Sequence, residues 1–489
     1  MKQISRRRFL RSTAATAAAF SLPASCWRAV AGANSDVRMA VVGFGGRGGD
    51  HIAGLRALAP KGVRIVALCD VDEKILAGGI DGFTRRSEKV NGYRDIRTLL
   101  ESTDVDAITV ATPNHWHALA AIWAVQAGKD VYLEKPVCHN VWEGSKIVEA
   151  ARKYKKIVQT GTQSRSSHAI AEAITWVRAG NLGKIIRARG LCYKPRHSIG
   201  KVDGPQPIPP QIDYNLWCGP APQAPLMRKR LHYDWHWVWD TGNGDLGNQG
   251  IHQMDIARWF LGEKELSPRV WSVGGRMGYI DDGQTPNTQI VYHDYSAAPL
   301  IFEVRGLPRA KEFQTDGDWN KNMDQYDGAS IGVIVECEGG HVLVPNYSSA
   351  IAYDKAGKQL QKWDGASDHY ENFIGAVRSR NYTDLAADIQ EGFVSSSLCH
   401  TGNISYRLGK HAQPGEISEK VKGDRDALAT FERMQHHLEA NGVNLTIDTL
   451  GLGEFLKMNP ARLKFTNSRD ANKLLTRDYR PPFVVPEKV

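Results

Sequence analysis

Three glycines early in the chain have the spacing of a phosphate-binding turn. Gly43, Gly45 and Gly48 form the pattern G-x-G-x-x-G within the stretch VRMAVVGFGGRGGDHIAGL. The first glycine permits a tight turn, the second lets a pyrophosphate approach the backbone, and the third lets a helix pack closely on a strand. The N-terminus of that helix favours phosphate charge. The spacing therefore predicts a dinucleotide-binding turn made by Gly43, Phe44, Gly45, Gly46, Arg47 and Gly48.

An acidic residue follows at the distance expected for ribose recognition. Asp70 comes after a second apolar run, residues 63–68, and lies 22 residues beyond Gly48, where about 20 residues are typical. A carboxylate here accepts hydrogen bonds from a free ribose 2′-hydroxyl and repels a 2′-phosphate. We therefore predict NAD as the cofactor, with NADP less favoured, although Arg64 and Arg85 argue the other way. The alternative is a glycine-rich loop of another α/β sheet, with Asp70 as a turn residue.

A lysine and a histidine have the chemistry needed to oxidise a hydroxyl group. Lys135 follows the predicted strand 130–133, in the stretch LEKPV. Hydride leaves a carbinol carbon as the hydroxyl proton is withdrawn, so a cation beside the oxygen stabilises the developing alkoxide. His252 titrates near neutrality and can accept that proton. The alternatives are a solvated loop lysine and a core histidine whose hydrogen bonds are satisfied.

The residues before His252 complete this predicted catalytic group. Residues 247–258 have the pattern of a helix, in which Asn248 and His252 are four positions apart and share a face. Asp245 precedes Asn248 by three residues, near the start of that helix. Asp245 could supply a negative charge, and Asn248 could hydrogen-bond a substrate hydroxyl.

An aromatic stretch before this helix has the composition of a sugar-binding surface. In HYDWHWVWD, residues 232–240, aromatic side chains alternate with other residues. We expect a strand that places Tyr233, Trp235, Trp237 and Trp239 on one face and His236 on the other. The alternative is a packed sheet interior or a subunit interface. Together with a tyrosine at the end of an earlier predicted strand, the predicted substrate residues are Tyr193, Trp235, His236 and Trp237.

The elements that must position these side chains alternate in type up to about residue 160. Short apolar runs at 37–42, 63–68, 107–111, 130–133 and 158–161 alternate with helical patterns, as in a doubly wound parallel sheet. Ligands bind outside the carboxyl ends of such strands. The loops there add these predicted cofactor contacts: Thr112, Pro113, Asn114, His115, Glu134, Lys135 and Gln163. Glu134 is expected to position its turn rather than to react.

Beyond residue 162 the pattern changes to strands without intervening helices. Residues 184–193, 269–275, 288–293, 301–304, 332–337 and 340–344 have strand character, which favours a large, mostly antiparallel sheet with one open face. The predicted fold class is therefore α/β followed by α+β. We expect a leader at 1–33, a Rossmann domain at 34–160, a substrate and oligomerisation domain at 161–410, and an extension at 411–489.

These motifs together resemble a known family. GFGGRG, ALCDVD, ATPNHWH and LEKPV are similar to the Gfo/Idh/MocA oxidoreductases. The resemblance implies that Lys135 lies beside the nicotinamide and the reacting carbon, followed by a proline often found in a cis bond. It also implies that His252 is the general acid/base, as the histidine of the family's D-x-G-x-H motif. Asn248 stands where the family has the aspartate.

The resemblance implies three activities to compare. The first is an NAD-dependent oxidoreductase acting on a sugar or cyclitol. The second is a redox-neutral glycoside hydrolase or lyase, related to glycoside hydrolase family 109, which oxidises, eliminates and re-reduces its substrate. That route needs a second base, for which Asp245, Tyr193 and His236 are candidates. The third is a non-catalytic NAD-holding protein, against which Lys135 and His252 argue.

The first 33 residues have the pattern of an export signal. Ser5 to Leu10 read SRRRFL, and an alanine-rich region with small-residue cleavage sites follows. We expect export by the twin-arginine translocase to the periplasm, with lipid anchoring at Cys26 a minor alternative. That route carries folded proteins, so the cofactor should be loaded before export and held tightly. No segment offers about 20 consecutive apolar residues, and so no membrane span is expected.

Composition is that of an ordinary globular enzyme. The formal net charge is +9. Six basic residues and no acidic ones fall within residues 1–33, which leaves +3 on the remainder. That balance does not indicate a nucleic-acid or membrane-surface partner. The seven cysteines form no C-x-x-C pair, so neither a metal site nor a disulfide framework is expected. We expect a homo-oligomer.

Overall fold

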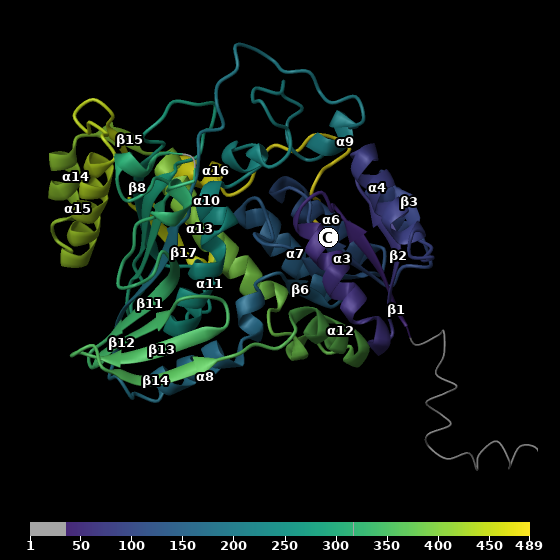
Figure 1. Ribbon diagram of the computed structural model, residues 1–489, viewed down its shortest axis with the longest axis horizontal. Helices are drawn as coiled ribbons and strands as arrows, with labels where there is room; N and C mark the ends of the chain where they lie inside the picture. The colour runs from purple at the N-terminus through teal and green to yellow at the C-terminus, as the bar shows by residue number, and fades with distance from the viewer. Residues whose placement is uncertain (1–35, 316) are drawn as a thin grey trace, which may run out of the picture.

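A computed structural model of the chain describes residues 36–315 and 317–489, which form a parallel-sheet domain beside a larger mixed sheet (Figure 1). The predicted leader, including the twin-arginine motif and Cys26, lies outside the described residues. Within them, no helix has the length and apolar character needed to cross a membrane.

The first domain is a six-stranded sheet in which every neighbouring pair is parallel. The strand order is β3-β2-β1-β4-β5-β6. The strands are β1 (Val37–Val42), β2 (Val63–Cys69), β3 (Asn91–Tyr93), β4 (Ala107–Val110), β5 (Asp130–Leu133) and β6 (Val158–Thr160). The connecting helices are α3 (Arg47–Ala57), α4 (Glu73–Thr84), α5 (Ile96–Leu100), α6 (Asn114–Gln126) and α7 (Val141–Lys153). The predicted doubly wound sheet is confirmed.

Side chains at the helix starts fix where several of these connections begin. The Asp72 carboxylate accepts hydrogen bonds from the backbone amides of Lys74 and Ile75 at the start of α4. The Asn140 side chain does the same for the amide of Glu143 at the start of α7. Such caps satisfy backbone donors that a helix leaves free at its N-terminus, and here they place the helices directly after the strand ends that carry the site.

The second domain is a large, mostly antiparallel sheet, as the sequence predicts. Its main path is β14-β13-β12-β11-β7-β10-β9-β8-β16-β15, and β7 and β10 are its parallel pair. The strands from residues 185–364 are β7 (Ile185–Tyr193), β8 (Arg269–Gly275), β9 (Thr288–His293), β10 (Leu300–Arg305), β11 (Ile331–Cys337), β12 (Gly340–Val344), β13 (Ser349–Asp354) and β14 (Gln359–Asp364). Later residues add β15 (Lys410–Ala412), β16 (Leu450–Leu452), β17 (Leu456–Asn459) and β18 (Lys464–Phe465).

Helices cover both faces of this sheet. One face packs in a single core with α8 (His168–Arg178), α11 (Gly250–Leu261) and α13 (Ile389–Arg407). On the other face, α14 (Pro414–Val421) and α15 (Arg425–Ala440) pack against residues of β7 to β12. They stand at the outer side of the sheet in Figure 1. The sequence after residue 410 is therefore part of the fold.

Two local predictions around the aromatic stretch are wrong. Residues 233–239 do not form a strand; Asp234–Trp237 is a 3₁₀ turn. Tyr233 adopts a φ of +64°, which breaks the extended backbone and ends the alternation of side chains. The helix predicted over 247–258 begins earlier and is interrupted, as α10 (Gly244–Asn248) and α11 (Gly250–Leu261).

The last residues return to the parallel-sheet domain. After α16 (Arg469–Lys473) the chain crosses from the large sheet, and its C-terminus lies near α6 (Figure 1). Phe483 is fully buried there. Its ring packs edge-on against Trp116 at a centroid distance of 5.5 Å. Helix α12 (His369–Ser379) also returns to this domain, packing on β1 and β2. The C-terminal segment and helix α12 thus both connect the second domain to the first.

Replacing Phe483 with alanine should destabilise the protein, because the change leaves a cavity among aromatic rings. We expect a loss of about 3 to 5 kcal/mol in the free energy of unfolding, measured by urea denaturation. The adjacent Val484 is 42% exposed, so Val484→Ala is the matched control and should cost less than about 0.5 kcal/mol. Equal effects of the two changes would contradict a structural role for this return.

Candidate active site

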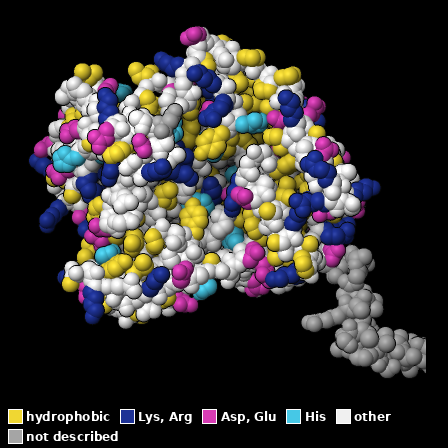
Figure 2. Space-filling view, in the orientation of Figure 1, with side chains coloured by type: hydrophobic (Ala, Val, Ile, Leu, Met, Phe, Trp, Pro, Cys, Tyr) yellow, Lys and Arg dark blue, Asp and Glu magenta, His cyan; other side chains and the backbone are white. Residues whose placement is uncertain are grey.

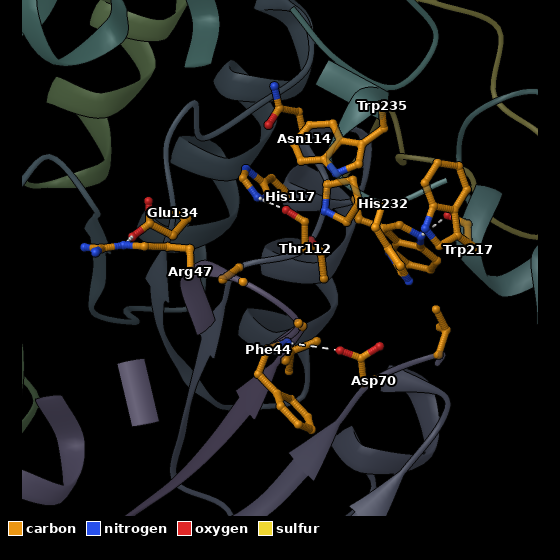
Figure 3. A pocket seen from close by; sticks show the side chains of 18 of the residues that line it. Phe44, Arg47, Asp70, Thr112, Asn114, His117, Glu134, Trp217, His232 and Trp235 are labelled. Carbon is orange, nitrogen blue, oxygen red and sulfur yellow. Dashed lines mark hydrogen bonds and ion pairs between the residues drawn. The ribbon is translucent and has the colours of Figure 1, made fainter. Parts of the chain in front are cut away.

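A cavity of about 530 Å³ opens at the carboxyl ends of the parallel strands. The space-filling view shows the molecule hollowed between its two domains (Figure 2), and Figure 3 shows the lining side chains. Most predicted site residues line this cavity. They are Gly43, Phe44, Gly45, Gly46, Arg47, Asp70, Thr112, Pro113, Asn114, Glu134, Lys135, Trp235, His236 and Asn248.

The glycine turn has no room for side chains at the three motif positions. Gly43 has a φ of +75°, and a Cβ there would lie 2.9 Å from the Thr112 amide nitrogen. A Cβ on Gly48 would lie 2.0 Å from the Gly43 carbonyl oxygen. A Cβ on Gly45 would meet the Ile75 side chain at 2.6 Å. This tight turn leads directly into α3, whose N-terminus favours an anion.

Asp70 closes the far side of the turn (Figure 3). Its carboxylate accepts hydrogen bonds from the backbone amides of Phe44 and Asp72, each at 3.0 Å. Burial raises the pKa of Asp70, and these two hydrogen bonds oppose the rise. The carboxylate is thereby fixed at the end of β2, beside the glycine turn, where the sequence predicts ribose recognition.

Glu134 is a buried carboxylate with cationic and polar partners. It accepts hydrogen bonds from Arg47 Nε at 3.0 Å and from the Lys135 backbone amide at 3.2 Å, and its Oε1 lies 3.1 Å from His51 Nε2. Burial raises its pKa, but the His51 contact and the charges of Lys135 and Arg47 outweigh burial and hold the pKa well below the usual range. Glu134 therefore stays ionised and orients the turn, as predicted.

Lys135 reaches from the first domain to the second. Its Nζ donates a hydrogen bond to the Asn248 carbonyl oxygen at 3.0 Å, and the peptide bond to Pro136 is cis. Burial lowers the pKa of Lys135; Glu134 opposes this, while Arg47 lowers the pKa further. The ammonium group is thus held in the cavity by a neutral carbonyl, with one carboxylate nearby.

His252 lies behind the cavity wall rather than on its surface. It is buried in α11, and its ring lies 4.8 Å from the Tyr347 ring. Its Nδ1 has no hydrogen-bond partner among the described residues. Burial and the charge of Lys135 lower its pKa to about 3. The imidazole is therefore neutral at physiological pH, the prediction that His252 titrates near neutrality is wrong, and the unpartnered Nδ1 is closed off from solvent.

Three predicted residues are not brought to the cavity. Asp245 is buried, and both its oxygens accept hydrogen bonds from Arg196, at 2.6 and 2.9 Å, so its charge is already compensated. Tyr193 donates to Glu303 at 2.8 Å, within the cluster on the sheet face covered by α14 and α15. Trp237 is buried against the Arg196 guanidinium. The prediction of direct substrate contacts by Tyr193 and Trp237 does not fit this arrangement.

Three further predicted cofactor residues support the site from behind. Gly48 packs under Gly43. The His115 Nε2 lies 2.9 Å from the Trp217 carbonyl oxygen. Gln163 donates a hydrogen bond to the Tyr132 hydroxyl at 3.1 Å. None of Gly48, His115 and Gln163 lines the cavity.

The structure adds residues that the sequence analysis missed. His117 lies with its ring nitrogens 2.6 and 2.8 Å from the carbonyl oxygens of Pro136 and Thr112, joining two loops of the site. Lys194, directly after β7, lines the cavity and donates to the Gln249 side chain at 2.8 Å. Because Lys194 directly follows a predicted strand, its position in the sequence could have indicated a site residue. Also lining the cavity are Arg94, Asp95, Trp217 and His232. Tyr233, which the sequence analysis placed in the aromatic stretch without naming it as a substrate residue, lines it as well.

No cluster of three or more histidine, cysteine or acidic side chains suited to a metal occurs in the described part of the chain. The six described cysteines are buried and unpaired.

Two family models match the chain. An oxidoreductase family with an NAD-binding Rossmann fold matches residues 37–162, and the C-terminal alpha/beta domain of the same family matches residues 180–303. Together they match 250 of the 489 residues. The first domain is therefore an NAD-binding Rossmann domain, and the cavity lies at its nucleotide-binding edge.

Curated relatives of the chain include dehydrogenases and a glycosyl hydrolase family 109 protein. Inositol 2-dehydrogenase from Salmonella typhimurium is 28% identical over 173 residues, 35% of this chain and 50% of that protein, so the chain spans about half the length of the first relatives it matches. Inositol 2-dehydrogenase from Rhodococcus jostii is 27% identical over 77% of this chain and 92% of that protein. A glycosyl hydrolase family 109 protein from Shewanella pealeana is 27% identical over 34% of this chain and 38% of that protein.

Solved structures share the fold. The WlbA dehydrogenase from Bordetella pertussis, in complex with NADH and UDP-GlcNAcA, has a TM-score of 0.54 and 18% identity, covering 74% of this chain and 94% of that one. Levoglucosan dehydrogenase, in complex with NADH and levoglucosan, has a TM-score of 0.54 and 17% identity, covering 74% and 95%. At these identities the likeness concerns the fold.

Adding a methyl group at Gly48 should disrupt the nucleotide-binding turn. Because the new Cβ would lie 2.0 Å from the Gly43 carbonyl oxygen, we expect Gly48→Ala to raise the Kd for NADH about tenfold or more, measured by calorimetry. At Gly49 a Cβ meets nothing within 4 Å, so Gly49→Ala is the matched control with unchanged affinity. Similar Kd values for both variants would contradict the proposed binding of the NADH pyrophosphate at the glycine turn.

Proposed function

Because the chain belongs to the Gfo/Idh/MocA oxidoreductase family, we propose that it is an NAD-dependent dehydrogenase that oxidises a hydroxyl group of a sugar or cyclitol. The observation that carries the proposal is the position of Lys135. Its ammonium group lies in the same cavity as the glycine turn, with its Nζ 3.0 Å from the Asn248 carbonyl oxygen. A cation there is suited to stabilise an alkoxide beside the nicotinamide end of the cofactor.

The residues of the first domain fit the cofactor. The turn from Gly43 to Gly48, in which Gly43 and Gly48 have no room for a side chain, lets the pyrophosphate approach the backbone, and Asp70 is positioned for the ribose hydroxyls. A fixed carboxylate there repels a 2′-phosphate, which supports NAD over NADP. NAD, when bound, supplies the acceptor for the hydride that leaves the substrate carbon.

Proton removal is assigned to Lys135 and His252. Lys135 lowers the energy of the developing alkoxide, and the neutral imidazole of His252, which does not line the cavity, accepts the hydroxyl proton through a bridging water. Asn248 lines the cavity and offers an amide to a neighbouring hydroxyl. Because an amide cannot ionise, it holds the substrate and takes no proton.

The substrate end of the cavity supports a hydroxylated ring as substrate. The Trp235 and His236 rings stack on each other at a centroid distance of 3.6 Å and both line the cavity. An aromatic pair of this kind can cover the C–H face of a sugar or cyclitol ring. Relatives named inositol 2-dehydrogenase are consistent with this class of substrate.

The redox-neutral glycosidase route has less support. It needs a second base, and two of the three candidates are committed elsewhere: Asp245 to Arg196 and Tyr193 to Glu303. His236 remains in the cavity, with Nδ1 2.5 Å from the Tyr233 carbonyl oxygen. The similarity to a glycosyl hydrolase family 109 protein keeps this activity in the test panel.

Export through the twin-arginine route, proposed from the SRRRFL motif, adds a condition on the cofactor. A periplasmic enzyme without a free nicotinamide supply must keep its NAD through purification. Denaturing the protein, purified without added nucleotide, should therefore release NAD(H) in stoichiometric amount. Release of no nucleotide would contradict tight retention.

The wild-type protein should oxidise members of a panel of sugars, sugar acids and cyclitols, giving a keto product and reduced nicotinamide. Lys135→Ala should lower kcat by about 10² to 10³ with the Kd for NADH little changed, since the lysine acts on the reacting oxygen. Lys89 is exposed, so Lys89→Ala is the matched control and should retain full activity.

Two results would contradict this assignment. Cleavage of aryl glycosides with no net nicotinamide reduction would favour the redox-neutral route. Full activity of Lys135→Ala would favour a role in binding alone.

A further inference from the structure

A second cavity, of about 590 Å³, lies outside the proposed reaction. Helix α13, the loop after Lys135, the end of the aromatic stretch and the C-terminal return form its walls. Asn243, which lines it, accepts a hydrogen bond at 2.9 Å from Asn114, which lines the first cavity. The two cavities therefore lie on opposite sides of this asparagine pair, and their lining residues do not overlap.

A buried acceptor in this wall has no partner. His400 is 3% exposed, and its Nε2 lies 3.0 Å from the Cys138 carbonyl oxygen. Burial lowers the pKa of His400 to about 4, so the ring is neutral and Nε2 carries its hydrogen. Nδ1 is then a hydrogen-bond acceptor, and it has no partner among the described residues. A buried polar atom without a hydrogen-bond partner in the protein is typically satisfied by a ligand or an ordered water.

A buried donor lies in the same wall. Arg477 donates a hydrogen bond to His139 Nδ1 at 3.2 Å. Because Nδ1 accepts, the hydrogen of the neutral His139 ring is on Nε2. That atom is buried, and although the ring lies near the Trp239 backbone, the atom makes no well-aligned hydrogen bond within the described residues. One acceptor and one donor on neutral rings match the two hydrogen-bonding roles of a hydroxyl group.

Two guanidinium groups supply positive charge. Neither Arg407 nor Arg477 has a carboxylate within 4 Å in the described part of the chain, although Asp240 and Asp478 also line the cavity. Arg477 is held by the Asp240 carbonyl oxygen at 2.9 Å. Arg407 makes no side-chain hydrogen bond to a described residue and lies over the Trp239 ring, 5.1 Å from its centroid. Guanidinium groups recognise carboxylates and phosphates through paired hydrogen bonds.

From these features we propose that the second cavity binds a small hydroxylated carboxylate, with a sugar acid as the ligand class. Its carboxylate pairs with Arg407 and Arg477, its hydroxyls bond to His139 and His400, and the Trp239 ring borders it. The volume lies within the range of small-molecule sites. Binding at this cavity does not require catalytic turnover, so it can be tested independently of the proposed dehydrogenase activity.

The test is calorimetric titration of the NAD-loaded protein with D-glucuronate. D-glucose and acetate serve as probes that lack the charge or the hydroxyls. We expect glucuronate to bind more tightly than either, and Arg407→Gln and Arg477→Gln each to weaken it about tenfold or more. Arg462 is exposed and forms no ion pair within the described residues. Arg462→Gln is therefore the charge-matched control and should bind glucuronate as the wild type does.

Several results would overturn the proposal. They are absence of glucuronate binding at millimolar concentration, equal affinity for glucose or acetate, and unchanged affinity in Arg407→Gln. Loss of the binding in Lys135→Ala would assign it to the first cavity and also overturn it. Thermal unfolding checks each variant; should Arg477→Gln fail to fold, Arg407→Gln decides, because the Arg407 side chain supports no described hydrogen bond.

Discussion

The candidate site depends on one buried charge, the Glu134 carboxylate. A buried carboxylate is costly unless cations and hydrogen-bond donors surround it. Glu134 obtains them from Arg47 and His51, both in α3, and from the backbone amide of Lys135. Satisfying this one group therefore fixes the nucleotide-binding turn against the end of β5 and leaves the Lys135 side chain pointing to the second domain.

Lys135 contacts the last residue of α10, Asn248, and the helix that follows it, α11, is anchored by charge. Asp255 in α11 accepts two hydrogen bonds from Arg165, both at 2.8 Å, and one from Ser395 at 2.6 Å. These partners come from the connection after β6 and from α13, which also packs on α7 of the first domain. Helix α11, and His252 within it, are thus held at a fixed distance from the parallel sheet. Geometry of this kind is what a hydride-transfer site requires.

Sequence reasoning succeeded where the chemistry is local. The glycine turn, Asp70 and the Glu134-Lys135 pair directly follow strands. The period of apolar residues and the spacing of the motifs predict where those strands end. It failed where a distant residue decides the outcome. Asp245 looked available for catalysis, but Arg196, 49 residues away, neutralises it. The aromatic alternation predicted a strand, but Tyr233 adopts a positive φ that no periodicity reveals. A helix carrying His252 is present as α11, but its start at Gly250 and the burial of His252 depend on tertiary packing.

The balance of charge around Lys135 explains why the site suits an oxidation. The cations Arg47, Arg94, Lys135 and Lys194 line the cavity, and the Glu134 carboxylate directly precedes Lys135 in the chain. The loss of water and the charges of Arg47 and Lys194 lower the pKa of Lys135 more than the charges of Glu134 and Asp245 raise it, which means that its positive charge is incompletely compensated. An alkoxide that forms during hydride loss brings the missing negative charge to this point. In the proposed oxidation the neutral hydroxyl of the substrate brings none, so we expect the same residues to bind the transition state more strongly than the ground state, which is the condition for catalysis.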